Sequence, residues 1–317
     1  MSDMIRTENL SKKFRSTAAV NDVSLAVPEG AIYALVGANG AGKTTLIKLL
    51  MNIFRPTAGG ARVMGIDCRH LAGKDFQHIG YVSENQEMPE WMTVETVLDY
   101  LRPFYPQWDR ALERQLVGQF DLPPKRKLKH LSRGMRMKAA FAASLAYRPK
   151  LIVLDEPFSG LDPLVRDEII EGLLDRAPET TILLSSHDLA EIESFASHVG
   201  YLEQGRILFS EEMPVLSGRF REITITLSTP SPLPQKIPPT WLQVEAGHSV
   251  IRFVDSNFRG QETAQELAEI FPSASDIAME SMPLRSIFLA IAKTGRTQTE
   301  LAPDLASLLK VQGKEEA

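Results

Sequence analysis

The sequence has very little cysteine. Cys68 is the only one among 317 residues, so no disulfide can form within the chain, and this usage suits a reducing compartment. Long apolar runs are also missing, since no segment approaches the roughly 18 uninterrupted apolar residues that a membrane span needs. The opening stretch, MSDMIRTENLSKKF, lacks the apolar core of a secretory signal. We therefore expect a chain that does not cross a membrane unaided.

An excess of positive charge is absent too. The formal net charge is -5 and the isoelectric point is about 5.8, the opposite of what a nucleic-acid binder with a basic surface requires. The basic run PKRKLKH at 124–130 is more typical of a solvated loop than of a binding site. We expect no nucleic-acid partner. The hydrophobic content of 44% is enough to bury the cores of one large domain and a smaller one.

The first two thirds of the chain have the sequence pattern of an α/β protein. Short apolar runs recur between helical patterns, and they read AVNDVSLAV, AIYALV, HIGYV, LIVLD and TILLSS. Strands of this kind that alternate with helices predict a mostly parallel sheet covered on both faces. Between about 86 and 148 the pattern is helical instead, which predicts a helical insertion between strands.

The pattern of apolar and polar residues changes again near residue 216. REITITL alternates, a proline-rich loop follows, WLQVEAGHSVIRFV has the pattern of a hairpin, and QETAQELAEIF and PLRSIFLAIAK are helical. We expect a main domain over 1–215, a small α+β domain over 216–295 and a polar tail over 296–317 that frays.

The clearest chemical signal is the segment GANGAGKT, which matches the pattern GxxxxGK[ST] between a predicted strand and a predicted helix. Its glycines let the backbone amides turn inward around phosphate oxygens, and the following helix presents its positive end. Lys43 is expected to reach the β and γ phosphates, and the Thr44 hydroxyl to coordinate Mg²⁺. The candidate phosphate-binding residues are Gly37, Ala38, Asn39, Gly40, Ala41, Gly42, Lys43, Thr44 and Thr45.

Two carboxylates end the apolar run LIVLDEP. Asp155 and Glu156 lie at the carboxyl end of a predicted buried strand, where open α/β sheets bind their ligands. Burying both is costly unless a cation or a water to be deprotonated uses them. We expect Asp155 to hold Mg²⁺ and Glu156 to act as the general base. His187 in TILLSSHD reaches the same edge; a histidine there is commonly structural, but beside these motifs it can position water at the γ-phosphate.

Five motifs occur along the chain in a fixed order, GANGAGKT, LSRGM, LIVLDEP, SGLD and SSH. Through these motifs, residues 1 to about 210 resemble the nucleotide-binding subunits of ATP-binding cassette (ABC) transporters. The resemblance implies a P-loop NTPase cassette with a mostly parallel core sheet, an antiparallel β-subdomain and the helical insertion. It also implies that two cassettes bind head to tail, as a homodimer or heterodimer, with each ATP held between one phosphate loop and the other signature motif.

Other residues take their roles from this resemblance. The signature stretch, usually LSGGQ, is here Leu131, Ser132, Arg133, Gly134 and Met135, and the loop that touches the facing cassette is Ser159, Gly160, Leu161 and Asp162. Arg133 is a departure that either contacts a phosphate or points outward. Phe14 stands where an aromatic stacks on adenine, although an ordinary core phenylalanine fits its spacing as well. The glutamine that links the γ-phosphate to the membrane partner is replaced by Glu84, and Gln86 follows two residues later; the role falls to one of these two residues.

The sequence thus predicts a Mg²⁺-dependent ATPase subunit that energises a separate membrane permease. Its expected location is the cytoplasmic face of the cell membrane, where the permease would hold it. The stretch PLRSIFLAIAKTG is similar to the closing segment of two-component exporters and favours export. Two alternatives are a soluble cassette ATPase that acts on ribosomes or nucleic acid, and a nucleotide-dependent regulator with little turnover.

Overall fold

The computed structural model describes residues 2–84 and 86–294. The chain divides into two compact units, Met1–Ile207 and Leu208–Ala317. The division falls within a strand, whereas the change of texture along the sequence placed it after residue 215. The predicted tail over 296–317 lies outside the described residues.

The larger unit is built on a six-stranded sheet whose order is β10-β9-β3-β8-β7-β6. The strands are β3 (Ile32–Val36), β6 (Ile79–Ser83), β7 (Leu151–Asp155), β8 (Thr181–Ser186), β9 (His198–Glu203) and β10 (Arg206–Glu212). The pairs β9–β3, β3–β8, β8–β7 and β7–β6 are parallel. Every residue of β3, β7 and β8 is buried, as expected for apolar strands covered on both faces.

A second, antiparallel sheet of order β2-β1-β4-β5 adjoins it. Its strands are β1 (Asp3–Phe14), β2 (Thr17–Pro28), β4 (Ala58–Val63) and β5 (Ile66–Asp67). The predicted alternation of β2 is present, because Val23, Leu25 and Val27 are all buried. They belong to one hydrophobic core with Leu35 of β3 and Val153 of β7, so the two sheets fold together.

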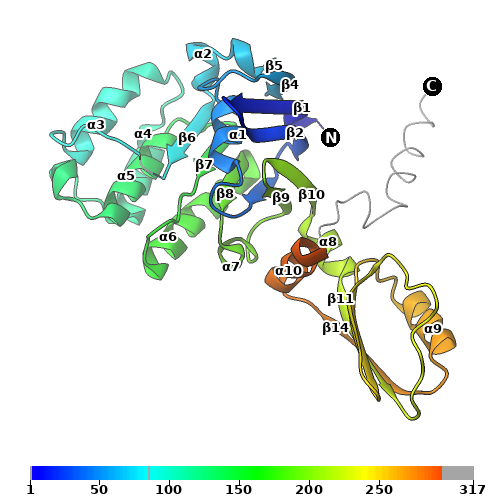
Figure 1. Cartoon of the computed structure of the whole chain (residues 1–317). Helices are drawn as coiled ribbons and strands as arrows, with labels where there is room; N and C mark the ends of the chain where they lie inside the picture. Colours follow the sequence, from blue (N-terminus) through cyan, green and yellow to red (C-terminus); the bar gives the residue numbers. More distant parts are fainter. Residues whose placement is uncertain (1, 85, 295–317) are drawn as a thin grey trace. The chain divides into compact units, whose positions relative to one another are not determined.

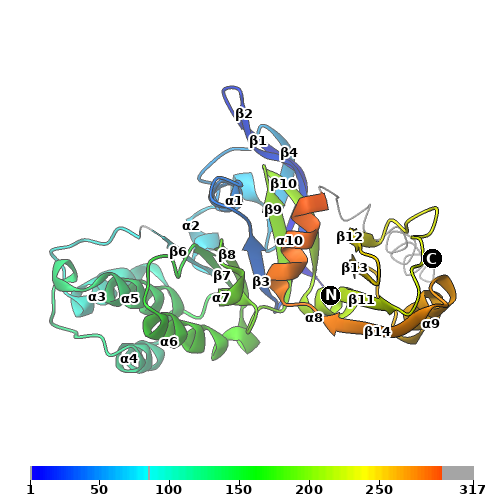
Figure 2. The same ribbon diagram turned by 60° about the horizontal axis from the view of Figure 1, so that its bottom comes forward.

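Helices connect and cover the strands. They are α1 (Lys43–Leu50), α2 (Gly73–Phe76), α3 (Val94–Leu101), α4 (Arg110–Gln119), α5 (Arg133–Leu145), α6 (Pro163–Leu174) and α7 (Leu189–Ile192). The helices α3, α4 and α5 come between β6 and β7 and gather beside the β6 edge of the sheet (Figures 1 and 2). Each of the three has an N-cap side chain that accepts a hydrogen bond from a backbone N–H of the first turn; these caps are Thr93, Asp109 and Ser132 respectively.

The smaller unit is an antiparallel sheet of order β12-β13-β11-β14 with helices. Its elements after β10 are α8 (Met213–Arg219), β11 (Arg221–Leu227), β12 (Trp241–Ala246), β13 (Val250–Asp255), α9 (Gln261–Ile270), β14 (Ala274–Ser281) and α10 (Leu284–Thr294). Ile225, Trp241, Phe253 and Phe271 are among its core residues. β14 was not predicted, since ASDIAMES has no strong alternation; the ladder with β11 makes it a strand.

Within residues 2–84 and 86–294, no helix has both the length and the apolar content needed to span a lipid bilayer.

Candidate nucleotide site

The phosphate loop follows β3 and opens α1 with a backbone that only glycine permits. Gly42, which precedes the first residue of α1, has φ +110°, and Gly40 has φ +83°. A Cβ added at Gly37 would lie 2.1 Å from the Leu202 carbonyl oxygen, and one at Gly42 would lie 2.2 Å from that of Ala19. Gly40 has no atom within 4 Å of such a Cβ, so its side of the loop is open. This is the cradle that phosphate oxygens require.

Lys43 and Glu156 meet beneath this loop. Lys43 Nζ lies 3.0 Å from Glu156 Oε1 and donates to the carbonyl oxygens of Gly37 at 2.6 Å and Ala38 at 3.3 Å. Both charged side chains are almost fully buried. Glu156 also adopts φ +50°, an unusual conformation for a residue with a side chain, at the turn that follows β7. Strain and a buried charge thus coincide at the residue predicted to be the base.

His187 completes this group from the end of β8. Its Nδ1 lies 2.7 Å from Glu156 Oε2. Glu156 is therefore held between an ammonium and an imidazole, while the half-exposed histidine ring remains open to solvent. The structure brings all three predicted catalytic residues together.

Asp155 lies beside Thr44, as expected for a pair that shares a magnesium ion. Its Oδ1 accepts hydrogen bonds from Thr44 Oγ1 at 3.0 Å and from Ser185 Oγ at 2.9 Å. Burial raises the pKa of the Asp155 carboxyl, although the bonds from Ser185 and Thr44 oppose that rise. In the described part of the chain, no three His, Cys, Asp or Glu side chains form a metal cluster.

Ser185 is a site residue that the sequence reasoning missed. It is fully buried, lies opposite Asp155 in the β7–β8 ladder, and its Oγ also accepts the backbone N–H of Glu156 at 2.9 Å. One hydroxyl thus fixes both acidic residues. The available signal was a pair of serines at the end of the buried strand TILLSS, where hydroxyl groups need hydrogen-bond partners.

A cavity of about 200 Å³ opens over these groups. Its lining includes Asn39, Gly40, Gly42, Lys43, Thr44, Thr45, Glu84 and Glu156, together with Ala19, which was not predicted. Glu84 therefore faces the nucleotide cavity. Gln86 does not line it; the Gln86 Oε1 accepts from Ser83 N and Oγ, and its side chain lies in a different groove.

The remaining predicted residues lie apart from this cavity. Ser132 and Asp162 act here as helix caps, accepting from Met135 N and Val165 N. Gly134 is buried, and a Cβ there would come 3.0 Å from Val165 Cγ1. Their roles at a phosphate remain predictions that need a second cassette.

Phe14 is not a core residue, because 42% of its surface is exposed. Its ring meets Phe54 edge to face at 5.3 Å, and Lys12 Nζ lies 5.0 Å from its centre. The alternative of an ordinary core phenylalanine is therefore wrong. An exposed, braced aromatic ring is compatible with stacking on a base, and that role stays a prediction.

A glycine cradle, a buried lysine, a threonine and paired carboxylates at the carboxyl edge of a parallel sheet define a P-loop nucleoside triphosphatase. A family model described as "ABC transporter" matches residues 20–159. The ATP-binding protein YtrB of Bacillus subtilis is 30% identical over 228 residues, which cover 71% of this chain and 78% of YtrB. The bacitracin transport ATP-binding protein BcrA of Enterococcus faecalis is 34% identical, over 71% of this chain and 74% of BcrA.

Solved structures agree. The ATP-binding subunit of an ABC transporter superposes with a TM-score of 0.62 at 26% identity, over 68% of this chain and 92% of that one. A dimeric bacterial ABC transporter cassette, 23% identical, matches the fold with a TM-score of 0.60 over 66% of this chain and 99% of its own. The chain belongs to the ABC transporter family and is an ATP-binding, ATP-hydrolysing subunit of that family, so the predicted family, fold class and general function are confirmed.

Proposed function

We propose that this chain hydrolyses Mg²⁺-bound ATP and couples the reaction to a separate membrane permease, in the direction of export. The observation that carries the proposal is the position of Glu156, in contact with both Lys43 and His187 beside the paired Thr44 and Asp155. Relatives whose names specify bacitracin transport and lantibiotic transport support a transport role, the latter being 32% identical over 66% of this chain.

The chemistry can be assigned to residues. The amides of the phosphate loop and the Lys43 ammonium bind the triphosphate and stabilise charge on its oxygens. Glu156 takes the proton of the attacking water, and His187 orients the Glu156 carboxylate through Oε2. Thr44 and Asp155 would hold Mg²⁺, which neutralises phosphate charge when bound. Because Lys43 contacts Glu156, a bound γ-phosphate would compete for the lysine and free Glu156 to act as a base.

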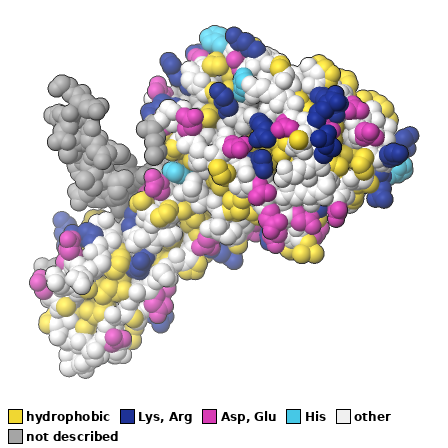
Figure 3. Space-filling view, turned by 180° about the vertical axis from the view of Figure 1, so that it is seen from behind, with side chains coloured by type: hydrophobic (Ala, Val, Ile, Leu, Met, Phe, Trp, Pro, Cys, Tyr) yellow, Lys and Arg dark blue, Asp and Glu magenta, His cyan; other side chains and the backbone are white. Residues whose placement is uncertain are grey.

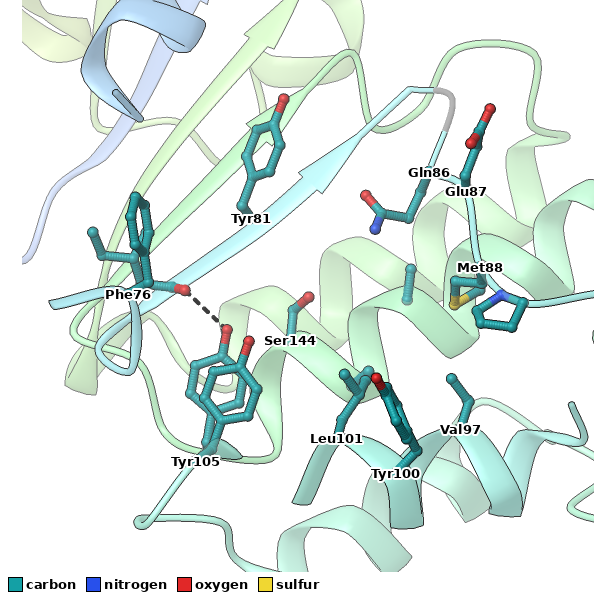
Figure 4. Close-up of a pocket in the computed structure, with 15 residues that line it drawn as sticks. Phe76, Tyr81, Gln86, Glu87, Met88, Val97, Tyr100, Leu101, Tyr105 and Ser144 are labelled. Atoms are coloured by element: carbon teal, nitrogen blue, oxygen red, sulfur yellow. Dashed lines mark hydrogen bonds between the residues drawn. The ribbon is translucent and has the colours of Figure 1, made fainter. Parts of the chain in front are cut away.

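A groove of about 400 Å³ supports the permease partner (Figure 4). It lies between the β6 side of the sheet and the helical insertion, and its lining includes Tyr81, Gln86, Met88, Tyr100 and Leu101. Figure 4 shows the Gln86 side chain pointing into this space opposite Tyr100 and Leu101 of α3. An apolar groove rimmed by a few polar groups suits an amphipathic helix, the type of segment by which a membrane subunit would dock.

A second cassette is the other proposed partner. The capping residues Ser132 and Asp162 do not reach the cavity of their own chain, so a phosphate contact by the signature turn requires a facing copy. We propose a head-to-tail pair, identical or not, attached to the permease at the cytoplasmic face of the membrane.

Ribosome or nucleic-acid remodelling receives less support. Acidic and basic side chains are mixed over the face of the larger unit seen in Figure 3, without the basic stripe that binds a phosphate backbone.

The test measures ATP hydrolysis by the purified full-length chain, alone and with its permease in vesicles. Lys43→Ala should lose nucleotide affinity and turnover, because the ammonium contacts the phosphates directly. Lys150→Ala is the control and should keep both, because Lys150 is exposed and precedes β7, at the opposite end of that strand from Asp155. Transport that continues unchanged with Lys43→Ala would rule out the proposed coupling.

A further inference from the structure

Two departures from the family pattern lie next to each other in this chain. Arg133 stands in the signature stretch, and its Nη2 lies 3.7 Å from Oε1 of Glu84, at the end of β6. Ser159 Oγ donates to the same Oε1 at 2.9 Å. One carboxylate oxygen thus joins three segments that are far apart in the sequence.

The guanidinium of Arg133 is placed by packing as well as by charge. A Cβ added at Gly160 would lie 2.8 Å from Arg133 Nη1, so the arginine lies directly over this glycine, whose φ is +66°. Any larger residue at 160 would displace the side chain. The half-exposed guanidinium of Arg133 thus lies against Glu84 and Gly160 of its own chain.

Glu84 lines two cavities. One is the nucleotide cavity over Lys43, and the other, of about 250 Å³, is lined by Glu84, Gln86, Arg133, Arg136 and Met137. The contacts of Glu84 with Ser159 and Arg133 both use Oε1, and Oε2 has no hydrogen-bond partner among the described residues. A carboxylate in this position repels a triphosphate unless a cation compensates its charge.

We propose that Arg133 is a positioning residue that acts through Glu84 of its own chain on the nucleotide site. This inference rests on the proposed function. Arg133 partly neutralises the Glu84 carboxylate and holds its Oε1 away from the triphosphate. A carboxylate can therefore occupy a position that faces ATP. Glu84 thereby serves the nucleotide cavity, whereas Gln86 lines the other two cavities, including the permease groove. Because the two side chains are 46% and 41% exposed, the pair adds little to folding stability and acts chiefly on the site.

The experiment is a double-mutant cycle in the full-length chain, with Glu84→Gln, Arg133→Gly and both together. ATP affinity is measured by calorimetry in the presence of Mg²⁺, at a dilution where light scattering shows monomers, and KM and kcat are measured alongside. Arg133→Gly should weaken ATP binding about threefold to fivefold, the scale of a half-exposed ion pair, with little change in kcat. In the Glu84→Gln background the same substitution should change affinity less than about twofold, because no carboxylate is left to compensate.

Two further variants make the result specific. Arg133→Lys should recover part of the affinity, since it keeps the charge. Arg110→Gly replaces the first residue of α4, as Arg133→Gly does for α5, and controls for the helix propensity of glycine. Moderate salt should shrink the effect of Arg133→Gly, because half-exposed charges are screened.

The opposite outcomes are distinct. An equal loss in both backgrounds, or a loss that appears only when the protein dimerises, would overturn the inference and assign Arg133 to the phosphate of a facing copy. Failure of the proposed function would look different: the unmodified chain would neither bind nor hydrolyse ATP, whatever residue occupies position 133.

Discussion

The two units of the molecule bury charged side chains in different ways. In the larger unit Lys43, Asp155 and Glu156 are buried at one edge of a parallel sheet, beside an open cavity. In the smaller unit Arg219 and Glu211 are equally buried, but Arg219 binds both oxygens of Glu211 and also donates to the Ser256 carbonyl at 2.8 Å.

The difference separates a site from a structural pair. The buried ions of the larger unit lie beside a cavity that is open to a ligand, and we propose that a phosphate replaces Glu156 as the partner of Lys43. In the smaller unit, Arg219 donates to both oxygens of Glu211 in a bidentate geometry that fixes the pair. Substitutions in the first group should therefore alter chemistry, and those in the second should alter folding.

The largest expected effect is that of Glu156→Gln. The amide keeps the shape of the side chain but cannot accept a proton, so kcat should fall by about 10²–10⁴-fold while ATP still binds. Steady-state phosphate release and ATP calorimetry measure the two quantities. Glu171→Gln, an exposed position of α6, is the control and should leave both unchanged. Substantial hydrolysis by Glu156→Gln would assign the base to another residue.

The same substitution offers a check of the proposed dimer. Because binding survives and turnover stops, Glu156→Gln protein should accumulate as a dimer in ATP, seen as a doubled mass in light scattering. A protein that stays monomeric at all ATP concentrations would contradict the head-to-tail arrangement.

Arg219→Met should have the largest effect on stability. It removes the bidentate arginine from the buried Glu211 carboxylate, at a cost of about 3–5 kcal/mol in the free energy of unfolding. Thermal unfolding followed by the fluorescence of Trp241, with the other tryptophans replaced, measures it in the smaller unit. Adding Glu211→Gln or Glu211→Leu should restore much of the loss. If ATP affinity at low temperature fell as sharply as stability, the distinction between the two units would fail.

Much of the nucleotide site could be predicted from the sequence, for a physical reason. Parallel strands end at the same edge, so the residues after β3, β7 and β8 must converge, and the register confirms it: Val36 pairs with Ser186 and Asp155 with Ser185. The glycine pattern likewise encodes a backbone shape directly. At this edge of the sheet, the local glycine motif and the strand topology both predict the same position for the phosphate site.

What the sequence left open depended on contacts between distant segments. Which of Glu84 and Gln86 lines the cavity over Lys43, and where Arg133 lies, depends on contacts with Ser159 and Gly160, which are far from them in the chain. The role of Ser185 arises only when β8 lies beside β7, and β14 is a strand only because β11 provides its ladder. Contacts between segments that are distant in the sequence cannot be predicted from the pattern of either segment alone.

A smaller effect is expected at the permease groove. Tyr100 lines it and is 54% exposed, so Tyr100→Ser removes an aromatic contact worth about 1–2 kcal/mol to a docked helix. Stimulation of ATP hydrolysis by the permease should therefore need a severalfold higher permease concentration. Ile53→Ser is the control, since Ile53 is similarly exposed on the larger unit but does not line the groove. Equal effects of the two substitutions would place the docking surface elsewhere.

The smallest effect concerns Asp155 and the pH dependence of stability. Burial raises the pKa of this carboxyl above its ordinary value, so between the ordinary and the raised pKa the folded state binds more protons than the unfolded state. Stability from this group therefore falls as pH rises through that window, and the cost of the buried charge is fully present at neutral pH. Asp155→Asn, whose amide oxygen still accepts from Thr44 and Ser185, should raise the thermal midpoint modestly at pH 7 and lose that advantage in acid.

Magnesium with ATP should make the unmodified chain more thermally stable than Asp155→Asn, the reverse of their order without ligands. A cation compensates the Asp155 charge, so Mg²⁺ and ATP together should stabilise the unmodified chain more than Asp155→Asn, by an amount set by ligand concentration over the dissociation constant. Thermal melts with ATP, in the presence of Mg²⁺ and in the presence of EDTA, measure the midpoints of both proteins with and without the cation. An Asp155→Asn protein that is less stable at pH 7 without ligands would mean that this carboxylate, like the Arg219 pair, holds the fold together instead of being kept there at a cost for a cation.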